Sequence, residues 1–184
     1  MPKTIEVLPC KYWDGKREVF FTYPEKPVTF QIEHSLVSIS KWEAKWKKPF
    51  LSKTNEQTKE ETLDYVRCMT ITKNVDPNIY YFLPESTVNE ITDYISDTMT
   101  ATTFGSSGPE KPSREIVTSE LIYYWMTAFQ IPFDCDKWHL NRLMTLIRVC
   151  SIKNAPQKKM GPNEIRARNR QLNAERRRAM NSKG

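Results

Sequence analysis

The charge of the chain is divided unevenly, because residues 151–184 are strongly basic. This segment holds ten Lys and Arg residues against two Glu, a net charge of +8, whereas the whole chain carries +6. The first 150 residues therefore carry −2. We infer a mildly acidic folded body joined to a basic C-terminal arm. Such a split implies a partner that the arm reaches, or an assembly in which the arm meets acidic surface.

The arm is predicted to be helical over roughly 162–181, because Pro162 suits the first turn of a helix. Its apolar residues Ile165, Leu172 and Ala179 are seven positions apart, with little apolar between them. That stripe is too narrow to hold the helix on the chain's own core. We therefore expect it either to dock on another protein or to be partly disordered when alone.

Six arginines give the arm two kinds of candidate partner. They could neutralise phosphates, which predicts salt-dependent nucleic-acid binding, or bind acidic protein surface through the same Coulombic attraction. They surround the helix rather than line one side, and their pattern leaves the two alternatives near even. A membrane surface ranks third, because the apolar stripe offers no Trp or Phe to bury. The arginines are Arg166, Arg168, Arg170, Arg176, Arg177 and Arg178.

Two periodicities in the body predict an α+β fold. Residues 4–34 contain alternating and β-branched runs with a turn at Asp14-Gly15, which predicts a small N-terminal antiparallel β-hairpin sheet. From Ser40 the spacing of apolar residues becomes helical, so the rest of the body should be mainly α-helical. The expected helices are 40–48, opened by a capping box at Ser40–Glu43; 58–69, opened by a box at Thr58–Glu61; 87–95; 119–129; and 135–152, capped by Asp134.

These elements divide the chain into five segments. The last two body helices, joined by a short connection containing Pro132, should form an antiparallel αα-hairpin. The segments are an N-terminal β element (1–37), a helical segment (38–104), a linker loop rich in Gly, Ser and Pro (105–113), the αα-hairpin (114–153) and the basic C-terminal helical arm (154–184).

The sequence favours an intracellular protein without catalytic chemistry. It has no apolar signal core and no long uncharged apolar stretch, so we expect neither secretion nor a membrane span. The four cysteines lack CxxC spacing, which favours reduced, buried thiols. With five glycines, the chain has no phosphate-cradling loop. We predict no enzyme activity, no catalytic residue and no cofactor.

Two smaller clusters have a functional and a structural interpretation. Cys135 and His139 are four apart and could both ligate a metal, but zinc needs three or four ligands, so a packing or hydrogen-bonding role for His139 is favoured and no metal is expected. Trp42 and Trp46 lie among lysines and could stack on single-stranded nucleic acid. Two core-facing tryptophans on an amphipathic helix are the favoured interpretation.

The C-terminal half of the chain resembles a known family. The residues that carry the resemblance are the runs Thr98–Thr103, Ile116–Met126, Ile131–Cys150, Asn154–Met160 and Arg168–Asn173. They are similar to tail assembly chaperones of tailed bacteriophages, and the likeness is best over about 98–175. A helix, a short Pro break and a second helix bearing Trp138 agree with the general pattern of such chaperones.

The resemblance implies a phage tail morphogenesis protein that binds the tape measure protein, keeps it soluble and helps recruit tail tube subunits. The hairpin would be the body of the binding site, with Trp125, Trp138, His139 and Arg142 as candidate contacts, and the basic arm a second contact to helical or acidic segments. The protein would act in the host cell cytoplasm during assembly. The alternatives are a structural virion protein, such as a tail or connector component, and a small basic nucleic-acid-binding protein; self-association is also possible.

Overall fold

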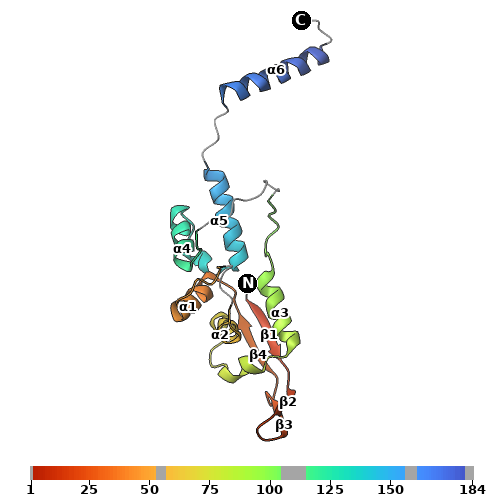
Figure 1. Ribbon diagram of the computed structural model, residues 1–184, viewed down its shortest axis with the longest axis vertical. Helices are drawn as coiled ribbons and strands as arrows, with labels where there is room; N and C mark the ends of the chain where they lie inside the picture. The colour runs from red at the N-terminus through yellow and green to blue at the C-terminus, as the bar shows by residue number, and fades with distance from the viewer. Residues whose placement is uncertain (1, 53–56, 105–114, 156–160, 181–184) are drawn as a thin grey trace. The chain divides into compact units, whose positions relative to one another are not determined.

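The chain has an α+β fold, in which two small antiparallel sheets at the N-terminus precede a mostly helical body (Figure 1). The computed structural model describes residues 2–52, 57–104, 115–155 and 161–180. The predicted linker 105–113 lies outside them. The strands are β1 (Lys3–Val7), β2 (Cys10–Asp14), β3 (Val19–Tyr23) and β4 (Val28–Ile32). The helices are α1 (Leu36–Trp46), α2 (Lys59–Met69), η1 (Pro77–Phe82), α3 (Glu85–Ser96), α4 (Ser119–Ala128), η2 (Phe133–Lys137), α5 (Leu140–Asn154) and α6 (Pro162–Ala179).

The N-terminal strands form one long hairpin that is divided into two paired regions. β1 pairs with β4 and β2 with β3, both antiparallel, with Lys3 opposite Ile32 and Trp13 opposite Phe20. Prolines interrupt both arms of the hairpin, at Pro9 on one side and within 24–27 on the other. Because proline has no N–H to donate, the ladder breaks there.

The two strand pairs differ in which side chains they bury. On the inward face of β1 and β4, the side chains of Ile5, Val7, Phe30 and Ile32 are completely buried. The outward face of β2–β3 instead exposes Trp13 and Phe20, whose ring centroids are 4.9 Å apart. Its other face rests on Phe82, the last residue of η1, which contacts three aromatic rings of the ribbon.

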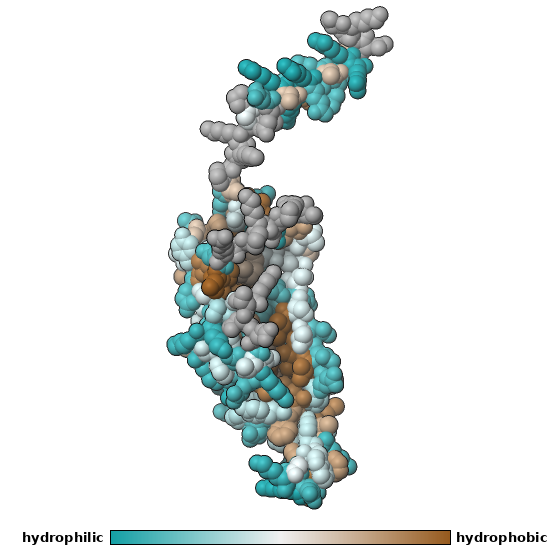
Figure 2. All heavy atoms as spheres, viewed as in Figure 1, coloured by the Kyte–Doolittle hydropathy of each residue, from teal (hydrophilic) through white to brown (hydrophobic). Residues whose placement is uncertain are grey.

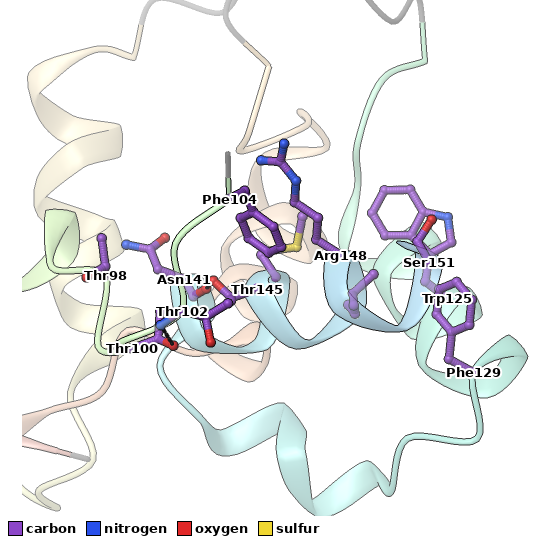
Figure 3. A pocket seen from close by; sticks show the side chains of 12 residues that line it. Thr98, Thr100, Thr102, Phe104, Trp125, Phe129, Asn141, Thr145, Arg148 and Ser151 are labelled. Atoms are coloured by element: carbon purple, nitrogen blue, oxygen red, sulfur yellow. Dashed lines mark hydrogen bonds between the residues drawn. The ribbon is translucent and has the colours of Figure 1, made fainter. Parts of the chain in front are cut away.

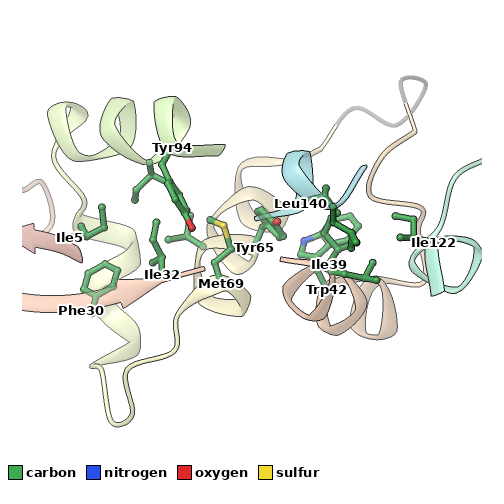
Figure 4. Close-up of a cluster of buried hydrophobic side chains, with 14 of the residues drawn as sticks. Ile5, Phe30, Ile32, Ile39, Trp42, Tyr65, Met69, Tyr94, Ile122 and Leu140 are labelled. Atoms are coloured by element: carbon green, nitrogen blue, oxygen red, sulfur yellow. The ribbon is translucent and has the colours of Figure 1, made fainter. Parts of the chain in front are cut away.

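One hydrophobic cluster extends through the described body (Figure 4). Figure 4 follows it from Ile5 and Phe30 of the sheet, past Tyr65 of α2, to Trp42 of α1 and Ile122 of α4. Trp42 is fully buried and its Nε1 donates to the carbonyl oxygen of Glu61 at 2.9 Å. The favoured interpretation of Trp42 as a core residue is therefore confirmed, and its ring is not available for base stacking.

The helix boundaries confirm one predicted capping box and correct the other. Thr58 caps α2, with its Oγ1 accepting from the Glu61 N–H and its N–H donating to the Glu61 carboxylate. The box predicted at Ser40–Glu43 is wrong, because α1 begins earlier: the Ser35 N–H donates to Ser38 Oγ at 3.0 Å.

Glu43 has a tertiary role in place of the predicted local one. Its side chain is 8% exposed and accepts from the N–H of Phe50 and the N–H of Ser119, each at 2.8 Å. The carboxylate of Glu43 thus connects the segment that follows α1 to the first residue of α4.

The predicted start of the last body helix is also wrong. Residues 133–137 form the 3-10 helix η2, in which the Cys135 N–H donates to the carbonyl oxygen of Pro132, and α5 begins only at Leu140. The Leu140 N–H donates to the carbonyl oxygen of His34 at 2.8 Å. Because of this arrangement, Cys135 and His139 do not share a helix face.

The chain divides into two compact units, Met1–Ser151 and Ile152–Gly184. In the second unit α6 is a continuous helix, as the sequence predicts. Ile165 and Leu172 of its apolar stripe are 45% and 40% exposed.

Candidate functional site

An open groove of about 660 Å³ lies along α5 (Figure 3). We call it the α5 groove. Figure 3 shows threonines from the segment after α3 near the first half of α5, and Trp125 and Phe129 of α4 near its second half. Its lining residues are Thr98, Thr100, Thr102, Phe104, Trp125, Phe129, Asn141, Met144, Thr145, Ile147, Arg148 and Ser151.

The threonine wall of the groove is positioned by one asparagine. Asn141 Nδ2 donates to the carbonyl oxygens of Ile95 and Asp97, at 2.9 and 2.8 Å, and so holds the end of α3 against α5. Beyond this point the chain turns, with Met99 in the left-handed region at φ 50° and the Thr102 N–H donating to Thr100 Oγ1 at 3.1 Å. Thr98, Thr100 and Thr102 all line the groove.

The rest of the lining is largely aromatic and aliphatic. Trp125 and Phe129 lie four apart on α4 and are partly buried against the core, as is Met144 of α5. The guanidinium of Arg148 lies over the ring of Phe104, 4.3 Å from its centroid. A groove with an apolar floor and hydroxyl groups on one wall can bury apolar surface of a ligand and pair with its polar groups.

Of the hairpin residues predicted to contact a partner, the structure places only Trp125 in the α5 groove. Trp138 and Arg142 form a separate pair, with the guanidinium 4.3 Å from the ring centroid. His139 is 1% exposed, and its Nε2 lies 2.9 Å from the carbonyl oxygen of Tyr94. A partner cannot reach this ring in the folded body, which corrects its place among the predicted contacts.

His139 belongs to a buried cluster with His34. The two imidazole centroids are 5.0 Å apart, and His34 Nδ1 lies 2.5 Å from the hydroxyl of Tyr65. Burial, with a smaller contribution from His139, lowers the pKa of His34 to about 3, and burial lowers the pKa of His139 as well. Both rings are therefore neutral near pH 7. Since a carbonyl oxygen only accepts, the proton of His139 resides on Nε2.

The cysteines are all free, as predicted, but they are not all buried. Cys10 is exposed, Cys68 and Cys150 are intermediate, and Cys135 is buried. Burial raises the pKa of Cys68 and of Cys135, which disfavours the thiolate form. Within the described residues, no group of three or more His, Cys, Asp or Glu side chains could hold a metal.

The predicted contacts of the basic arm lie on an exposed helix. Figure 2 shows α6, located as in Figure 1, covered mostly by hydrophilic side chains with a few apolar ones between them. Ile165, Arg166, Arg168, Arg170, Leu172, Arg176, Arg177 and Arg178 are all exposed. Among the helices that the structure describes, none is long and apolar enough to cross a membrane.

Sequence reasoning found the helices of the α5 groove but missed its threonine wall. The position of this wall depends on the hydrogen bonds from Asn141 to the carbonyl oxygens of Ile95 and Asp97, more than forty positions away, and no local pattern contains these contacts.

Comparison of the chain with known protein families, with curated proteins and with solved structures finds no match.

Proposed function

We propose that the protein is a non-enzymatic phage tail assembly chaperone, whose body binds an amphipathic segment of the tape measure protein in the α5 groove. The observation that supports this proposal is the groove itself. Most of its lining comes from the runs Thr98–Thr103, Ile116–Met126 and Ile131–Cys150, which carry the resemblance to tail assembly chaperones.

The chemistry of the groove agrees with binding rather than catalysis. Its apolar floor has the partly buried side chains of Trp125, Phe129 and Met144 to bury against a partner, and large aromatic side chains commonly contribute most at protein interfaces. The threonine hydroxyls can satisfy polar groups at the edge of a bound helix. On this proposal the protein acts in the host cytoplasm and helps recruit tail tube subunits after it has bound the tape measure protein.

Co-expression with the tape measure protein of the same phage tests the proposal. The expected result is a larger soluble fraction of the tape measure protein than it shows alone. Thr145→Arg places a long charged side chain in the groove without removing a core residue, so it should abolish the gain. Asn89→Arg, at an exposed position of α3, adds the same charge outside the groove and should leave the gain intact.

Two results would count against the proposal. If the tape measure protein gains no solubility, or if Thr145→Arg behaves like Asn89→Arg, the groove is not a chaperone site. Mass spectrometry of purified virions addresses the remaining alternative. A chaperone should be absent from mature particles, whereas a tail or connector component would be present in every one.

A further inference from the structure

The continuous helix α6 separates its side chains onto different faces. At about 100° per residue, Arg166, Arg170 and Arg177 fall within an arc of roughly 40°. Asn163 and Asn173 lie at the two edges of the same side, so the five residues together span an arc of about 80°. We call these five residues the Arg/Asn face. The six arginines surround the helix, but the helical register places three of them on one side.

The other faces of α6 have different chemistry. Glu175 lies about 160° from the middle of the Arg/Asn face, and Gln171 Nε2 donates to its carboxylate at 3.5 Å. The apolar stripe of Ile165 and Leu172 faces a third direction. The Arg/Asn face is therefore uninterrupted by acidic or apolar residues over roughly 21 Å of helix.

The donors of this face are accessible. All five side chains are exposed. The ion pairs found between described residues do not involve Arg166, Arg170 or Arg177. Arginine and asparagine offer, between them, the donor groups that bind phosphate oxygens and the base edges of guanine and adenine.

From this arrangement we propose that the Arg/Asn face of α6 binds duplex DNA in the major groove. An α-helix with its side chains is about 10–12 Å across and the major groove is about 12 Å wide, so the face can enter it. Its arginines would contact phosphates and guanine edges, and its asparagines adenine edges. The surface is distinct from the α5 groove, so the inference goes beyond the proposed function and neither depends on the other.

The composition of α6 argues against other occupants. The helix has no aromatic side chain on which the bases of a single strand could stack. The major groove of duplex RNA is too deep and narrow for side chains to read. A second copy of α6 would be equally basic and repelled. An acidic protein helix would need an apolar contact, and the Arg/Asn face has none.

Fluorescence anisotropy with the full-length protein and a labelled duplex DNA of about 20 base pairs tests the proposal between 50 and 300 mM salt. The triple variant Arg166→Ala, Arg170→Ala, Arg177→Ala should flatten the dependence of log K on log salt by about 0.9 for each arginine that contacts a phosphate, up to about 2.7 for all three. The matched variant Arg168→Ala, Arg176→Ala, Arg178→Ala loses the same charge elsewhere on the helix and should flatten it by less than about 1.

Circular dichroism of both variants checks that their helix content equals that of the unchanged protein. Alanine should not reduce it, because alanine has the highest helix propensity. Equal flattening in the two variants would show attraction by net charge alone and overturn the assignment of the face. Absence of binding to duplex DNA at 50 mM salt would also overturn it. So would displacement of the DNA by poly-glutamate at equal charge concentration, which would identify an acidic protein as the partner.

Discussion

At the scale of single residues, burial of the histidine pair makes protonation of either ring unfavourable. His34 and His139 are 2% and 1% exposed, and their rings pack edge to face with each other. His34 Nδ1 is hydrogen-bonded to the hydroxyl of Tyr65 in α2, and His139 Nε2 to the carbonyl oxygen of Tyr94 in α3. The pair therefore connects α2 and α3 to the start of α5. Protonating either ring would bury a positive charge beside a second imidazole.

We therefore expect the body to lose stability as the pH falls below 6.5. The folded pKa of His34 lies at about 3, whereas an unfolded histidine titrates near 6.5. Between these values the unfolded chain binds more protons, so the free energy of unfolding falls as the pH falls. The slope for His34 should approach about 1.4 kcal/mol per pH unit below 6.5. Urea unfolding at pH 7.5, 6.5 and 5.5 measures it.

The control is His34→Gln, which keeps a hydrogen-bonding side chain but cannot take up a proton in this range. Its free energy of unfolding should change less between pH 7.5 and 5.5 than that of the unchanged protein, whatever its value at pH 7.5. A variant that retained the full pH dependence would show that other groups produce it.

At the scale of elements, local patterns predicted where helices lie better than where they begin. Thr58 and Glu61 form a box within one turn, and the sequence predicts α2 correctly from them. The start of α5 depends instead on the hydrogen bond from the Leu140 N–H to the carbonyl oxygen of His34. Glu43 accepts hydrogen bonds from the N–H groups of Phe50 and Ser119 rather than capping its own helix. Contacts between distant segments leave no periodicity in the sequence, so these boundaries and the threonine wall of the α5 groove could not be predicted.

The β2–β3 ribbon shows the same dependence on a distant contact. A two-stranded ribbon is marginally stable alone. Here Tyr12, Phe21 and Tyr23 all have ring centroids within 5.6 Å of the Phe82 ring. We infer that Phe82 supplies most of the packing that holds the ribbon on the body.

Replacing Phe82 by alanine should therefore release the ribbon selectively. Each lost aromatic contact is worth about 0.5–1.5 kcal/mol, so amide hydrogen exchange in β2 and β3 should accelerate about tenfold or more. The amides of β1 and β4, whose inward side chains are buried, should change much less. Tyr81→Ala removes an adjacent tyrosine that is 56% exposed and should leave the ribbon protected. Equal acceleration in all four strands would contradict a local role for Phe82.

At the scale of the whole molecule, the buried core and the excess positive charge lie in different units of the chain. The buried hydrophobic residues of the described chain all fall between Ile5 and Ile147, whereas the basic residues of α6 are exposed. The uneven charge in the sequence predicted this division, but not the separate faces of α6, which follow from its helical register.

Deleting residues 162–184 should consequently leave the thermal stability of the body unchanged. Because no described side chain of α6 belongs to the buried core, the expected shift in Tm is under about 2 °C, which corresponds to less than about 1 kcal/mol in a chain of this size. Met126→Ala is the comparison for a core change. Met126 is fully buried, and its truncation should cost about 2–5 kcal/mol and lower the Tm by several degrees. Differential scanning calorimetry of the three proteins at one pH and salt concentration measures both shifts, and a deletion that destabilised the body as much as Met126→Ala would mean that the arm contributes to folding.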